Sequence, residues 1–75
     1  MCLGIPMRIV EVREDGMAQA EAFDVRRTIA TVLLTKPPKV GEYVMVHVGY
    51  AIETLEYEEA MEILTLLDAV AREGA

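Results

Sequence analysis

The sequence IPMRIVEVREDGMAQAEAF, residues 5–23, contains a strand–turn–strand pattern. Apolar residues alternate with polar or small residues on both sides of an Asp-Gly pair, Asp15 and Gly16. Such alternation is typical of a strand with one face in a core, and Asp-Gly between two such runs favours a hairpin, because glycine accepts positive φ without steric cost. We therefore predict a strand over residues 5–12, a turn at 14–16 and an antiparallel strand over 17–23.

The same alternation predicts which side chains of this hairpin face the core. In the first strand, Ile5, Met7 and Ile9 share one face, and Arg8, Val10 and Val12 share the other. In the second strand, one face consists of small side chains, which favours close contact with a bulky residue or a neighbouring strand: Ala18, Ala20 and Ala22.

The next segments continue the β pattern. After a turn at Asp24, residues 25–34 are rich in β-branched side chains and form the longest predicted strand. Residues 36–39, Lys-Pro-Pro-Lys, indicate a loop, because proline cannot donate to a sheet ladder. Residues 43–48 alternate again, with the valines facing the core. Gly49 then allows a sharp bend before a short last strand at residues 50–52.

From Leu55 the apolar period becomes helical, with a stripe that we expect to pack on the strands rather than to bind a partner. Thr54 is the predicted N-cap, and Gly74 follows the helix as a stop signal. The predicted fold is mainly β: a small OB-fold-like antiparallel β-barrel at about residues 5–53 with a C-terminal α-helix at about 55–73. Residues 1–75 form a single domain. The stripe comprises Tyr57, Ala60, Met61, Leu64, Leu67 and Ala71, widened by Ile63, Leu66 and Val70.

Composition narrows the function. The chain has 75 residues and a net charge of −6, which disfavours nucleic acid as a partner. No apolar run is long enough to span a membrane, and no signal peptide is evident at the first residues, so we expect no membrane partner and a cytoplasmic protein. A single cysteine forms no internal disulfide, in agreement with a reducing compartment.

That cysteine, Cys2, lies beside the chain start, where it is either an incidental residue or a reactive group. If Met1 is removed, Cys2 carries a free amine as well as a thiol, and the ammonium favours the thiolate, which is the nucleophile and the soft-metal ligand. We expect the working form to begin at Cys2. Gly4 gives the backbone freedom after it, and Pro6 fixes φ at the start of the first strand.

His47 is the only histidine, on the strand face opposite the valines, and a lone histidine is more often structural than functional. Cys2 and His47 as nucleophile and base would need an enclosed pocket, for which a chain of this size offers little room. As metal ligands they suit a transition metal, yet two ligands cannot complete a structural zinc shell. An incomplete shell implies sharing of the metal with another protein, as in a carrier or scaffold.

Two motifs carry a family resemblance: MCLGIPMRIVEV, residues 1–12, and GEYVMVHVGYAI, residues 41–52. Both resemble the motifs of the HypC/HupF family of NiFe-hydrogenase maturation chaperones. The resemblance implies a chaperone rather than an enzyme, one that works with the protein HypD to assemble an Fe(CN)2CO group and then contacts the hydrogenase large-subunit precursor. The family's essential cysteine corresponds to Cys2 and its motif histidine to His47, both expected to hold iron, with Gly4, Pro6 and Gly49 as supporting motif residues.

The chain departs from the family pattern between the second and third strands. Residues 22–27 read AFDVRR, whereas the family shows an Asp-Phe-Gly-Gly-Val-Arg-like run, and Met7 stands where the family often has glycine. Two alternatives from other classes are an OB-like nucleic-acid-binding module, which the acidic balance disfavours, and a small thiol enzyme, which would modify its substrate without a partner.

Overall fold

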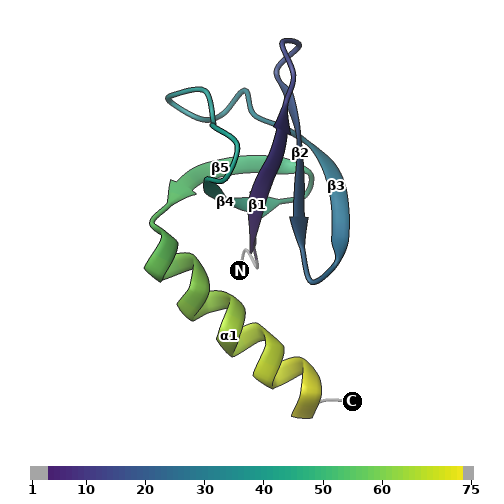
Figure 1. Ribbon diagram of the computed structural model, residues 1–75, viewed down its shortest axis with the longest axis vertical. Helices are drawn as coiled ribbons and strands as arrows, with labels where there is room; N and C mark the ends of the chain where they lie inside the picture. Colours follow the sequence, from purple (N-terminus) through teal and green to yellow (C-terminus); the bar gives the residue numbers. More distant parts are fainter. Residues whose placement is uncertain (1–3, 74–75) are drawn as a thin grey trace.

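Five strands close into a small barrel, and one helix follows them (Figure 1). The computed structural model describes residues 4–73. The mainly β barrel with a C-terminal helix is therefore confirmed. The elements are β1 (Ile5–Val12), β2 (Met17–Ala22), β3 (Val25–Ala30), β4 (Tyr43–His47), β5 (Tyr50–Leu55) and α1 (Tyr57–Glu73).

The strand order around the barrel is β1-β2-β3-β5-β4, with β4 returning to β1. All neighbours pair antiparallel, as predicted, except β3 and β5, which run parallel and are joined by the single pair Ala30↔Tyr50. Parallel neighbours need a long connection, which residues 31–42 and β4 supply here. The barrel is therefore closed on this side by one short contact.

The predicted Asp-Gly hairpin joins β1 to β2. Gly16 has a φ of 82°, which favours glycine, and the Asp15 carboxylate accepts a hydrogen bond from the Met17 N–H at 3.1 Å. The Arg13 N–H donates to the Met17 carbonyl at 3.0 Å and closes the turn. The chain reversal thus uses the residues that the sequence pattern indicated.

A bulge in β1 changes the side-chain faces that we predicted. The β1–β2 register shifts between Ile9 and Glu11, so Val10 is an extra residue in the ladder. Val12 consequently pairs with Ala18, which is fully buried, and shares its face of the sheet. The prediction that Val12 shares a face with Arg8 is wrong, because alternation alone does not reveal an inserted residue. Val12 nevertheless remains 42% exposed at the end of β1.

β3 is shorter than predicted, ending at Ala30 instead of Leu34. The N–H and the hydroxyl of Thr31 both donate to the Gly16 carbonyl, at 2.8 and 3.0 Å, and the Leu34 N–H donates back to the Thr31 carbonyl at 3.2 Å. The bonds to Gly16 continue the β2–β3 pairing by one residue, and the Leu34–Thr31 bond then closes a turn that takes the chain out of the sheet. Val32, the β-branched residue after Thr31 in the predicted strand, therefore lies in a turn, despite its strand propensity.

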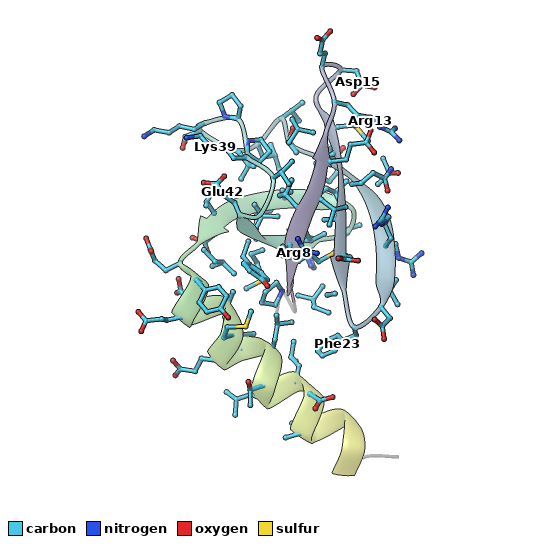
Figure 2. The ribbon with its side chains drawn as sticks, in the orientation of Figure 1. Arg8, Arg13, Asp15, Phe23, Lys39 and Glu42 are labelled. Carbon is cyan, nitrogen blue, oxygen red and sulfur yellow. The ribbon has the colours of Figure 1, made fainter. Side chains whose placement is uncertain are left out.

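The connection to β4 is the predicted proline loop. Lys39 and Glu42 close its last turn (Figure 2). The Lys39 N–H donates to the Glu42 carboxylate at 2.8 Å, and the Glu42 N–H donates to the Lys39 carbonyl at 3.0 Å. Gly41 and Glu42 are also bonded to the backbone of Ile9, both at 2.8 Å. These bonds attach the end of the loop to the middle of β1 and set the start of β4.

Small and branched side chains fill the barrel. The alanine face of β2 lies in the core as predicted, since Ala18 and Ala20 are fully buried and Ala22 packs at the edge. Small side chains on β2 leave room for larger ones across a narrow barrel. The buried cluster comprises Met7, Ile9, Ala18, Ala20, Ile29, Val44, Val46 and Ala51.

α1 begins two residues later than predicted, and Thr54 is not its N-cap. Thr54 lies in β5, which extends to Leu55, and Glu56 precedes the helix and accepts the Ala60 N–H at 2.9 Å. The N-cap prediction failed because β5 continues almost to the start of the helix, and Thr54 pairs with Val44 in the β4–β5 ladder. Within the described residues, no helix is long and apolar enough to cross a bilayer.

Only part of the apolar helix stripe packs on the barrel, against β1 and β4. Ala60 is fully buried, and the Tyr43 and Tyr57 rings meet edge to face with centroids 5.8 Å apart. Further along, α1 runs away from the strands (Figure 1), and Leu66 and Val70 are 63% and 67% exposed. The prediction that the whole stripe packs on the barrel is therefore wrong for its second half.

Candidate functional site

The first strand begins close against β4. Because Ile5 pairs with Val46, Gly4 comes at the level of His47, the last residue of β4. A Cβ placed on Gly4 would lie 2.5 Å from the Met45 sulfur and 3.2 Å from the Val46 carbonyl oxygen. Glycine at position 4 therefore allows a close approach of the chain to β4 that a side chain would obstruct.

Pro6 is buried inside β1 although it has no N–H to donate. The Ile9 N–H donates to the Glu42 carbonyl in the connection to β4, so alternate residues of β1 face β4 and Pro6 faces β2. The pairing of β1 with β2 begins only at Arg8↔Glu21. The Pro6 nitrogen therefore lies before the start of the β1–β2 ladder. Pro6 restricts the backbone at the start of the strand without removing a sheet hydrogen bond.

His47 lies at the end of β4 that is next to Gly4. Val44 and Val46 are buried, so the alternation directs Met45 and His47 to the outer face of the barrel, as predicted. His47 is half-buried, and its imidazole makes no hydrogen bond or ion pair with the side chains of residues 4–70. Its two nitrogens are therefore available to a ligand or a partner as far as the described chain is concerned.

A tight two-residue turn fixes the end of β4. His47 pairs with Tyr50, and Val48 and Gly49 between them have φ angles of 52° and 82°. Positive φ at both central positions is the requirement of a type I′ hairpin turn, which confirms the predicted bend at Gly49. Val48 also adopts a positive φ, although this backbone conformation is strained for a β-branched residue.

Cys2, the other predicted site residue, lies outside residues 4–73, so its contact with His47 stays a prediction. Gly4, Pro6, His47 and Gly49 lie at one end of the barrel, where β1 begins and β4 ends. Within the described residues, no group of three or more His, Cys, Asp or Glu side chains is placed to hold a metal ion.

Met45 is a site residue that the sequence pattern did not single out. Its thioether lies beside Gly4 and shares the outer face of β4 with His47. The signal was weak, because a methionine in an alternating strand is usually only packing. The glycine directly before the Ile-Pro start of the strand was the better clue, since such a residue often marks a close approach of backbone and neighbour.

Comparison with known proteins identifies the family of this chain. The model of the HupF/HypC family matches residues 1–67, which include Cys2, the Gly4 contact and the whole of β4. The chain belongs to the HupF/HypC family. This finding confirms the resemblance that the two sequence motifs carry.

Several relatives in this family are similar over most of their length. The hydrogenase maturation factor HypC of Cupriavidus necator is 43% identical over 72 residues, covering 96% of this chain and 79% of the relative. HypC of Azotobacter chroococcum is 45% identical over 67 residues, covering 89% and 79%. The hydrogenase maturation factor HybG of Escherichia coli is 32% identical over 72 residues, covering 89% and 88%.

Proposed function

We propose that this protein is a hydrogenase maturation chaperone and not an enzyme, acting through Cys2 with His47 in support. Its role is to help assemble an Fe(CN)2CO group together with HypD and to deliver it to the large-subunit precursor of a NiFe hydrogenase. The iron group is cargo shared with a partner. The observation that carries the proposal is the family match over both motifs, combined with the approach of Gly4 to β4 beside His47.

Chain geometry supports a joint role for the two residues. Two residues span at most about 7 Å, so Cys2 is tethered within that distance of Gly4, which lies at the level of His47. A thiolate and an imidazole both suit a transition metal such as iron. Two protein ligands leave the remaining coordination positions for the diatomic groups and for a partner's side chain, which is what a carrier needs.

The exposed half of α1 supports the need for a partner. Ile63, Leu66, Leu67 and Val70 follow the spacing i, i+3, i+4, i+7, and the last three are exposed. An apolar helix face left in water favours association with another protein. We therefore include the second half of α1 in the surface that meets a maturation partner.

Complementation of a host strain that lacks its own copy of the gene tests this function. We expect the unaltered chain to restore hydrogenase activity, Cys2→Ala to restore none and His47→Ala to restore part of it. Thr35→Ala, an exposed loop change, serves as the control and should restore full activity. Normal activity with Cys2→Ala would refute the proposed role of the thiol.

A further inference from the structure

β3 has a free edge over most of its length. Its six residues all pair with β2, but only Ala30 pairs with β5, through the bond from the Ala30 N–H to the Gly49 carbonyl at 2.9 Å. Figure 1 shows β3 on the outside of the β1–β2–β3 side of the barrel. Such an edge is a place where another extended chain can add.

The ladder identifies which backbone groups of this edge are open. The Thr31 N–H bonds to the Gly16 carbonyl, so alternate residues counted back from position 31 bond to β2, and the residues between them face outward. Ala30 is one of the outward residues, as its bond to Gly49 shows. The other two are Arg26 and Thr28, both exposed, whose backbone N–H and C=O groups have no partner in residues 4–73.

A pocket of about 380 Å³ runs along this edge. One wall is the inward face of β3, and the opposite wall is the β4–β5 turn, where Val48 is 80% exposed. The floor is the start of β1 with Val46. Every lining side chain except those of Arg27 and Thr28 is apolar: Ile5, Met7, Ala22, Val25, Ile29, Val46 and Val48.

Arg27 is the single charged residue of this lining. It is exposed, and it forms no ion pair with any side chain of residues 4–70, the part of the chain whose side chains are described. The guanidinium of neighbouring Arg26, by contrast, lies 3.9 Å from the Glu21 carboxylate on the outer face. On a chain of net charge −6, an unpaired guanidinium beside an apolar pocket favours a carboxylate from another molecule.

We infer that the β3 edge binds an extended segment of a partner protein by strand addition, with an apolar side chain in the pocket and an acidic side chain two residues away on Arg27. Strand addition uses the open backbone groups for affinity and alternate side chains for specificity. Because side chains on one face of a strand are two residues apart, the recognised pattern is apolar-x-acidic. This inference goes beyond the maturation role and does not depend on it.

In the register centred on Arg27, a second copy of this chain is a poor occupant. Antiparallel pairing of two β3 edges about Arg27 would place the two Arg27 side chains directly opposite each other, and like charges in that position are destabilising. The charge of the pocket therefore favours a different, acidic segment.

The test uses the full chain and a fluorescent, acetylated and amidated peptide, Thr-Thr-Ile-Thr-Glu-Thr-Thr. We expect saturable binding with a dissociation constant below about 1 mM. Binding should also slow amide exchange at Arg26 and Thr28. N-methylation of one alternate set of peptide amides should abolish binding, and methylation of the other set should not, because only one set faces β3.

Protein variants separate the pocket from bulk charge. Arg27→Glu should weaken peptide binding by about tenfold or more, and Arg27→Gln should weaken it by less. Arg13→Glu, at the distant β1–β2 turn, should not change peptide binding (Figure 2). The inference is overturned if the peptide does not bind at about 1 mM, or if Arg13→Glu weakens binding as much as Arg27→Glu does. Protection from amide exchange in α1 instead of β3, or dimers in sedimentation without the peptide, would also overturn it.

Discussion

At the scale of single residues, two tight turns contain backbone angles that their side chains disfavour. Phe23 and Asp24 join β2 to β3 with φ angles of 51° and 65°, and Val48 precedes Gly49 at 52°. Left-handed backbone costs an ordinary residue roughly 1–2 kcal/mol. The β2–β3 turn is therefore a tight two-residue reversal formed without glycine, at some expense of stability.

Val48→Asn should stabilise the fold by about 1 kcal/mol, because asparagine tolerates the left-handed region and Val48 is largely exposed. Urea unfolding measures the change. Val40→Asn is the control, since Val40 is also exposed but has no positive φ. An equal gain at both positions would show that strain at Val48 is not the cause.

Gly4→Ala should destabilise the protein by about 1 kcal/mol, because the new methyl group would meet the Met45 side chain and the Val46 carbonyl. Met45→Ala in the same chain should recover most of the loss by removing the nearest atoms. A double-mutant cycle by thermal unfolding gives the coupling. Additive losses would contradict the close contact of Gly4 with Met45.

At the scale of elements, the sequence predicted the strands through alternation and the hairpin through Asp15 and Gly16. It did not predict the bulge at Val10 or the early end of β3, because neither alternation nor β propensity reveals an inserted residue or a turn such as the one that the Leu34–Thr31 bond closes. The helical period of the apolar residues was evident in the sequence, but the extent of helix packing was not. Periodicity does not reveal how far a helix extends beyond the strands on which it packs. Of the site, the sequence indicated His47 and Gly49 and missed Met45.

The two halves of α1 should respond differently to the same substitution. Leu66→Glu lies on the exposed half, so its effect on unfolding should stay within about 0.5 kcal/mol. Ala60→Glu places a carboxylate at a fully buried position and should cost more than about 3 kcal/mol or prevent folding. Circular dichroism melts of both variants test this, and a large loss with Leu66→Glu would mean that α1 packs along its whole length.

At the scale of the whole molecule, the barrel serves as a rigid support that brings the start of β1 to the end of β4. The core and the ladders fix Gly4, Pro6 and His47, while the β3 edge and the second half of α1 remain open to partners. This division separates the residues needed for folding from those proposed to act on the iron group. Cys2 precedes the first ladder residue, so its removal should leave stability within about 0.5 kcal/mol.

We propose that the thiol of Cys2 holds the iron group. The measurement that tests this proposal is the iron content and the infrared absorption of cyanide and carbon monoxide in the proposed complex of this chain with HypD, purified without oxygen. We predict both signals with the unaltered chain, a reduced level with His47→Ala, and none with Cys2→Ala even though that variant unfolds at an unchanged temperature. A Cys2→Ala complex with full iron and both diatomic bands would contradict the account.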